Sequence, residues 1–234
     1  MDVVRYHQAG KLSGWIEING QREAVDDNWF GMRDHSWGTR GTGIGARLSD
    51  LQPGQVLNEM GLLWGPWLLK RPDGSAYELM HFWVNSSSWK YLSAHQNEAG
   101  ARPGEIRQTE IVEMTPNVRF DPKTRRFLGG TYDIALATGE RRTIEVTPVG
   151  DTAFHLRTGE YEGWKGHYHG SWRGDYHEDG EHIASVAASI GSVGQFRDAP
   201  VMVRDGDAVG YGIQESIYRG LFPDLGLLED SNHL

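Results

Sequence analysis

Cysteine is absent from the 234 residues of this chain, so it has neither disulfides nor thiol chemistry. A basic character is missing too, because 23 Lys and Arg stand against 32 Asp and Glu and leave a formal charge of −9. This charge argues against nucleic acid as a partner, since binding its phosphates needs a basic face. No apolar run approaches the roughly 20 residues of a membrane span, and no signal-like stretch opens the chain. We therefore expect a cytoplasmic protein without a membrane span.

Three motifs of common enzyme classes are also missing. The chain contains no G-x-S-x-G nucleophile elbow, no Walker-type phosphate loop and no dinucleotide-binding fingerprint. The glycine-rich run at residues 41–45 lacks the strand, loop and helix order of a phosphate cradle, so we interpret it as a flexible connection. The motifs therefore give no support to a serine hydrolase or to a nucleotide-dependent enzyme.

Glycine and aromatic residues are abundant instead. The chain has 31 Gly, 9 Trp and 9 Tyr, a balance typical of a strongly twisted and turned sheet with bulky side chains filling or lining it. Strand patterns recur at intervals of roughly 10–15 residues, the rhythm of an antiparallel barrel or sandwich. They cover residues 12–18, 78–84, 131–136, 143–147 and 153–157.

Turn signals separate these strand patterns. Asn19-Gly20 is the strongest of them and predicts a tight hairpin. Residues 57–63 allow one or two helical turns, and residues 39–54 and 93–105 are interpreted as loops at the mouth of a barrel. The sequence predicts an all-β fold, an antiparallel barrel or sandwich with few short helices, in which residues 1–234 form a single domain.

The most informative segment is the run Arg-Asp-His-Ser-Trp-Gly that begins at Arg33. If this segment is buried, Asp34 and His35 form a proton-handling pair beside the indole of Trp37. Arg33 or Arg40 then supplies the counter-charge. The other interpretation is structural, with an Arg–Asp ion pair and a core tryptophan that lock a strand junction. The sequence leaves both interpretations open.

Three segments resemble a known family. They are Arg-Tyr-His-Gln-Ala-Gly at residues 5–10, the run Gly-Met-Arg-Asp-His-Ser-Trp-Gly-Thr-Arg at residues 31–40, and Gly-Tyr-Gly-Ile-Gln-Glu at residues 210–215. Their order is similar to that in the hydroxyneurosporene synthase (carotenoid 1,2-hydratase) and AttH-like lipocalin-fold superfamily, in its bacterial branch with an R-D-H-S-W-G-x-R motif. The resemblance implies a lipocalin-like barrel that corresponds to the motif plus the C-terminal half of a longer, two-half protein.

This resemblance also implies an activity. Characterised members of the superfamily add water across an isolated alkene of a terpenoid, relatives act as cyclases, and neither generally needs an organic cofactor. We therefore expect a hydratase/lyase or a cyclase/isomerase that acts on a terpenoid or polyketide-like small molecule in the barrel lumen. A non-catalytic carrier of an apolar ligand and a structural half without activity are the alternatives. The resemblance implies that most of an N-terminal half is absent, which leaves two alternatives: a short natural variant, or a barrel that a second copy or a partner subunit completes.

Alkene hydration begins with protonation of carbon, so the acid has to be held in a dry place. A carboxylic acid beside an indole stays protonated near neutral pH because desolvation raises its pKa, which suits Asp34 next to Trp37. If Arg33 pairs with Asp34 instead, the carboxylate is ionised and His35 becomes the better acid. A carbocation is then stabilised by aromatic faces, each worth roughly 0.5–2 kcal/mol.

Further candidates for the substrate pocket lie on the strand patterns. His81 and Trp83 are two residues apart and share one face, and Tyr211 is expected on the late strand together with Glu215. A buried Glu215 needs a partner, for which Arg33 or Arg40 is suitable.

A second histidine group follows in residues 167–182. His167 and His169 would lie on one face of a strand and Trp172 on the other. Spacing identifies no third metal ligand there, because His177 and His182 would lie at the far tip of a hairpin. We therefore expect no metal site and interpret His167, His169 and Trp172 as pocket or surface residues.

Overall fold

The computed structural model is almost entirely built from strands. One short α-helix, α1 (Val186–Val193), and one 3₁₀ helix, η1 (Pro223–Leu225), accompany the strands among the described residues. No described helix is long and apolar enough to cross a membrane. The structure describes residues 2–26, 29–39, 59–87, 89–160, 163–168 and 171–228.

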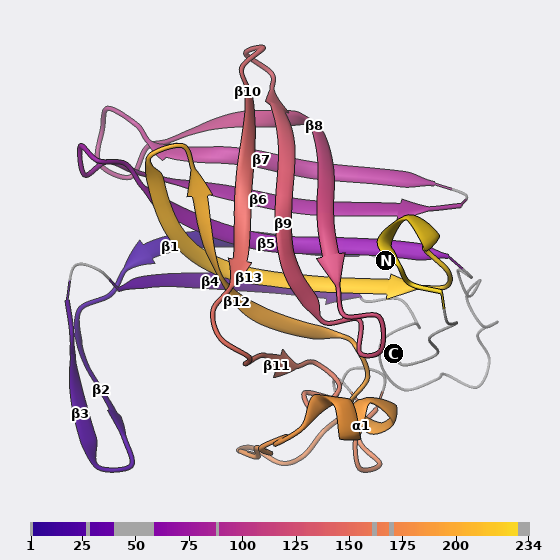
Figure 1. Cartoon of the computed structure of the whole chain (residues 1–234). Helices are drawn as coiled ribbons and strands as arrows, with labels where there is room; N and C mark the ends of the chain where they lie inside the picture. The colour runs from indigo at the N-terminus through magenta and orange to yellow at the C-terminus, as the bar shows by residue number, and fades with distance from the viewer. Residues whose placement is uncertain are drawn as a thin grey trace.

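Eight antiparallel strands form a closed barrel (Figure 1). Each strand pairs with its neighbour, and β10 closes the barrel on β12 through register pairs from Glu145 and Arg204 to Pro148 and Val201. The predicted all-β antiparallel barrel is confirmed, and the chain supplies every strand of the closed wall. The strands are β5 (Met60–Lys70), β6 (Ala76–Ser86), β7 (Lys90–Ala99), β8 (Ile106–Phe120), β9 (Phe127–Leu136), β10 (Arg141–Pro148), β12 (Arg197–Asp205) and β13 (Ala208–Arg219).

The barrel interior is filled by side chains. Alternate residues along each strand point inward, as with Ile144 and Val146 on β10 and Val201 and Val203 on β12, all of which are buried. Aromatic rings occupy the centre, where the Trp67 ring lies 5.1 Å from that of Tyr132. The predicted strands at residues 78–84, 131–136 and 143–147 are confirmed within β6, β9 and β10.

Glycines on β13 allow that strand to lie close against β5. A Cβ added to Gly210 would lie 1.8 Å from the Leu68 carbonyl oxygen, and one on Gly212 would lie 2.3 Å from that of Pro66. Only glycine fits at such an approach of two backbones. The Gly-Tyr-Gly run therefore has a packing reason, and it leaves the side chain of Tyr211, which is half exposed, on the outer face.

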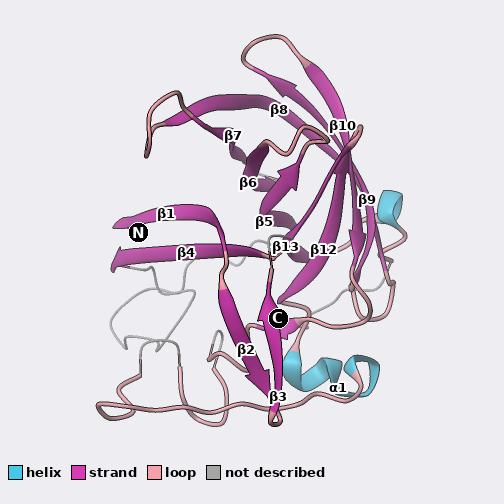
Figure 2. Cartoon of the chain, turned by 90° about the vertical axis from the view of Figure 1, so that its left-hand side faces the viewer, coloured by secondary structure: helices cyan, strands magenta, loops and turns pink. Residues whose placement is uncertain are grey.

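Two further sheets lie outside the barrel. The strands β1 (Asp2–Lys11) and β4 (Phe30–Thr39) form a two-stranded ribbon, and β2 (Gly14–Ile18) and β3 (Gln21–Val25) form a hairpin that extends from it (Figure 2). The hairpin turns at Asn19 and Gly20, whose φ angles of 53° and 77° match a tight two-residue turn. The predicted hairpin is confirmed.

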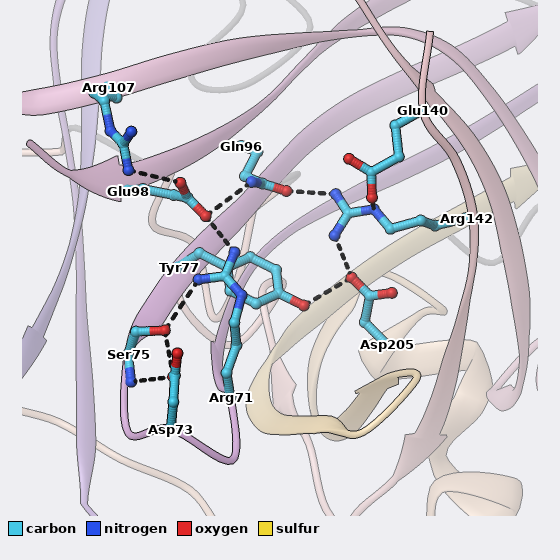
Figure 3. Close-up of polar contacts among 10 residues, drawn as sticks. All are labelled: Arg71, Asp73, Ser75, Tyr77, Gln96, Glu98, Arg107, Glu140, Arg142 and Asp205. Carbon is cyan, nitrogen blue, oxygen red and sulfur yellow. Dashed lines mark hydrogen bonds and ion pairs between the residues drawn. The ribbon is translucent and has the colours of Figure 1, made fainter. Parts of the chain in front are cut away.

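A polar network closes one end of the barrel, and we call it the end network (Figure 3). Arg142 Nη1 donates to Asp205 Oδ2 at 2.5 Å, and the Tyr77 hydroxyl donates to the same oxygen at 2.7 Å. Arg71 binds Glu98, and Gln96 joins the two halves by accepting from Arg142 and donating to Glu98. Arg107 and Glu140 lie at its rim.

Four sequence predictions of local structure are wrong. Residues 93–99, expected as loop, belong to β7, and their polar character reflects contacts with the end network. Residues 60–63 begin β5 rather than a helical turn, since they pair with β6 and β13. Only Phe154–His155, β11, forms a strand within 153–157. The described part of 163–184 has no strand, so His167 does not lie on one.

Candidate functional site

The ribbon has two chemically different faces. Directly paired residues share a face of an antiparallel ribbon, and the register pairs His7 with Asp34 and Tyr6 with His35. Asp34 and His35 are therefore neighbours in sequence that point to opposite sides. They do not face a common space, and the two halves of the predicted proton-handling pair have separate surroundings.

Asp34 lies on the face that meets the barrel. Its Oδ1 is 3.2 Å from His7 Nε2 and 3.5 Å from Arg5 Nε. Both partners reach the buried indole of Trp64 on β5, with the His7 ring 5.7 Å and the Arg5 guanidinium 5.8 Å from its centroid. Asp34 therefore lies on the side of the ribbon toward the outer wall of the barrel, with its side chain 34% exposed, and not in the lumen.

Two further carboxyl groups stand on that outer wall. Asp198 on β12 pairs in register with Glu215 on β13, and Glu215 pairs with Trp64 on β5, so the three side chains form one row across the sheet. The Asp198 and Glu215 carboxyls share a hydrogen bond. We call Asp34, Asp198 and Glu215 the carboxyl cluster.

The electrostatics of this cluster favour a retained proton. Burial raises the pKa of Glu215 well above its usual range, the nearby Asp198 and Asp34 raise it further, and Arg5 opposes them. Burial likewise raises the pKa of Asp198 to about 6. Two carboxyls in contact cannot both ionise cheaply, so the pair favours a shared proton.

Apolar side chains form part of the surroundings of the carboxyl cluster. Trp64, Leu68, Met80 and Ile217 on the outer wall are buried, and β1 crosses β5 above them. Among the described residues, neither the Trp64 indole nitrogen nor Asp198 Oδ1 has a hydrogen-bond partner, although both atoms are buried. Each unpaired buried polar atom costs about 1–3 kcal/mol, which a bound molecule or water would offset.

The remaining residues of the motif face outward. His35, Trp37 and Arg33 are exposed on the other side of the ribbon. The His35 ring lies 5.5 Å from each of the Tyr6 and Trp37 rings, and the Arg33 guanidinium lies 5.7 Å from the Tyr6 centroid. Asp34 is paired with Arg5 rather than with Arg33, and Arg40 falls outside the described residues.

His81 lies in the barrel lumen instead. It is 1 % exposed, and its ring is 4.4 Å from that of Trp67 and 5.5 Å from that of Tyr132. Burial lowers the pKa of His81 to about 3, so this imidazole is neutral at physiological pH and is a poor acid. Tyr132 donates to Gln214 Oε1 at 2.9 Å. Trp83 shares the face of His81 and is half-buried.

The other predicted pocket residues are dispersed. Tyr211 is exposed on the outer face of β13, on the same side as Glu215 and four residues before it. His167 is half-buried and Trp172 is exposed in the segment after β11, and His169 lies outside the described residues. In the described ranges, no three His, Asp or Glu side chains group as a metal site.

Three residues of the site were missed by the sequence reasoning. Arg5 and His7 are two residues apart in the first resembling segment, so the sequence predicts that they share one face of a strand. Their approach to Asp34 depends on the register of β1 on β4, which leaves no local signal. Asp198 stands beside Arg197 in a strand pattern and has no local signal of its role either.

Comparison with known proteins places the chain in a family. Residues 1–227 match the model described as "Family of unknown function (DUF8625)", and the chain belongs to that family. No curated protein matches the sequence. A similar solved structure is kievitone hydratase from Nectria haematococca, with a TM-score of 0.46 and 12% identity over 93% of this chain. The chain spans 53% of that protein, about half its length, and so weak a likeness does not indicate a shared activity.

Proposed function

We propose that this protein is a cofactor-independent acid/base enzyme that acts on an apolar small molecule between the ribbon and the barrel. The observation that carries the proposal is the Asp198–Glu215 carboxyl pair, held in one row with the Trp64 indole and facing Asp34. A protonated carboxyl beside an indole in a partly dry place is suited to protonating carbon.

The proposed reaction is addition to an alkene or its reversal. Glu215 gives its proton to one alkene carbon and becomes a carboxylate, and the neighbouring carbon becomes cationic beside Trp64. Water adds to that carbon, and the proton that it releases returns to the carboxyl pair. Loss of a proton from carbon in place of water addition gives isomerisation. Attack of a second alkene of the same substrate on the cationic carbon, followed by loss of a proton, gives cyclisation. Asp34, which is ion-paired with Arg5 and lies 3.2 Å from His7 Nε2, orients the ribbon side of the site.

Deuterium incorporation tests this proposal. Purified protein is incubated in heavy water with a panel of alkene-bearing terpenoids and polyketide-like compounds, and the products are measured by mass spectrometry. We expect the wild type to place deuterium on carbon of at least one compound. Glu215→Gln should lower this rate by about 100-fold or more, the usual contribution of a general acid, and leave ligand binding largely intact. Asp34→Asn, which removes the orienting group, should lower the rate by less.

Glu145→Gln is the matched control, because Glu145 is an exposed acid on β10. It should keep the wild-type rate. Asp198→Asn serves as a second variant if Glu215→Gln unfolds, which circular dichroism reports. A wild-type protein that binds a compound without exchange at carbon would favour the carrier, and full activity of a folded Glu215→Gln would refute the catalytic role.

A further inference from the structure

A pocket of about 300 Å³ lies at the end of the barrel below α1. The beginnings of β9 and β12, the end of β10 and the loop at residues 150–153 line it, together with Val186, the first residue of α1. Apolar atoms of Phe127 and Pro148 form part of its wall. This pocket is separate from the carboxyl cluster, because successive residues of β12 point to opposite faces and Asp198 faces outward.

Arg197 brings a guanidinium with two unpaired nitrogens into this pocket. Its side chain is 2 % exposed and lines the pocket. Within the described residues, neither its Nε nor its Nη2 has a hydrogen-bond partner. The acid at the rim, Asp151, is paired with Arg126. Asp121 accepts hydrogen bonds from the backbone amides of Lys123 and Thr124 and from the Thr124 hydroxyl.

A guanidinium that is buried without a partner is costly. Burying a charge without pairing costs several kcal/mol, and burial lowers the pKa of Arg197 only to about 10. The group therefore stays charged at neutral pH. By contrast, the buried Arg125 donates to the carbonyl oxygens of Tyr218 and Gly220 at 2.7 Å each. The fold thus gives Arg125 Nη1 two backbone acceptors, whereas Nε and Nη2 of Arg197 have none among the described residues.

Two other features near Arg197 favour an anion. His155 pairs with it in register across β11 and β12, is buried, and has an Nδ1 without a partner among the described residues. It lines a neighbouring pocket of about 530 Å³ that shares Val186 and the 151–153 wall. The helix α1 begins at Val186 and has no acidic residue in its first turn, so the positive end of its dipole is uncompensated there.

We propose that this pocket binds the anionic group, carboxylate or phosphate, of a small molecule. Arg197 forms the charge-assisted hydrogen bonds to the anion, and the apolar remainder of the molecule packs against Phe127, Pro148 and Val186. The bound anion pairs with the buried guanidinium and offsets the free-energy cost of burying its charge. The site is independent of the carboxyl cluster and of the reaction proposed there.

Octanoate, octanol and inorganic phosphate are the probes for this site. In calorimetric titrations at neutral pH, octanoate should bind to the wild type, and octanol, which has the same chain without the charge, should bind at least tenfold more weakly. Competition of inorganic phosphate with octanoate would assign phosphate as a source of the anion, and its failure to compete would assign the carboxylate.

Two variants locate the binding. Arg197→Met should weaken octanoate binding at least tenfold, and Arg204→Met, which removes an exposed arginine from the same strand, should leave it unchanged. If Arg197→Met does not fold, Val186→Asp places a carboxylate at the helix start, where it favours the helix and occupies the anion position. Equal binding of octanol and octanoate, or octanoate binding that survives in a folded Val186→Asp, would overturn the proposal.

Discussion

The end network and the carboxyl cluster use the same residue types and handle charge in opposite ways. In the end network Asp205 receives Arg142 and Tyr77, and Glu98 receives Arg71 and Arg107, so ionised groups are matched. In the carboxyl cluster three carboxyls meet Arg5, with His7 as a further partner of Asp34. Matched charges stabilise a fold, whereas an excess of carboxyls at a partly dry interface holds a transferable proton.

Breaking the end network should give the largest change in stability. Arg142→Met leaves the carboxylate of Asp205, whose side chain is only 7% exposed, without its cation. Removing one partner of a buried ion pair typically costs about 3–5 kcal/mol. Because the Tyr77 hydroxyl remains as a donor, we expect the free energy of unfolding to fall by about 3 kcal/mol. Urea unfolding followed by tryptophan fluorescence measures it.

Arg141→Met is the control for that comparison. Arg141 is the neighbour of Arg142 and forms an exposed pair with Glu113, with side chains 71% and 60% exposed. Exposed pairs of this kind contribute at most about 1 kcal/mol. Equal destabilisation by the two substitutions would show that the end network is not the stabilising element described here.

The pH dependence of stability should distinguish the carboxyl cluster from the end network. Burial raises the pKa of Asp198 to about 6 and that of Glu215 further above its usual range. The folded state therefore binds these protons more tightly than the unfolded chain. The contribution of these carboxyls to the free energy of unfolding should fall as pH rises from about 4 through about 6, by at most about 1.4 kcal/mol per pH unit for one group. Buried His81, whose pKa is lowered to about 3, contributes in the opposite direction, so the carboxyl contribution is read from the difference between variants.

Asp198→Asn should flatten this fall, and Glu145→Gln should not change it. Both sets of unfolding curves are recorded in urea at a series of pH values with constant ionic strength. Parallel pH profiles of the wild type and Asp198→Asn would mean that the two carboxyls do not hold a proton more tightly in the folded state, and would contradict the account.

The fold was largely predictable because its signals are local. Alternation of apolar and polar residues marks β6, β9 and β10, and Asn19-Gly20 forces the hairpin between β2 and β3. The prediction for residues 93–99 was wrong because the inward side chains Gln96 and Glu98 contact the end network. The strand therefore lacks the apolar alternation that marks the other strands. The strand predicted around His167 was wrong because histidine and aromatic residues alternate there, but no neighbouring strand pairs with the described part of the segment.

The site was less predictable because it depends on register and on contacts between distant segments. Asp34 was identified from its motif, and the structure adds Arg5 and His7 through pairing of β1 with β4. Adjacent residues of a strand point to opposite faces, so no spacing rule could keep Asp34 and His35 together once the segment became a strand. Glu215 was expected to need a cation, and its hydrogen-bond partner is another acid, Asp198, brought by β12.

Titration of the side-chain carboxyls by carbon-13 NMR tests the central claim most directly. With Asp and Glu labelled, assignment by Asp198→Asn and Glu215→Gln identifies the two signals. We predict that the Glu215 carboxyl titrates well above the usual range of a glutamate and that its signal moves when Asp198 is replaced. Ordinary pKa values for both carboxyls, with each ionised at pH 7 and neither responding to replacement of the other, would contradict the account.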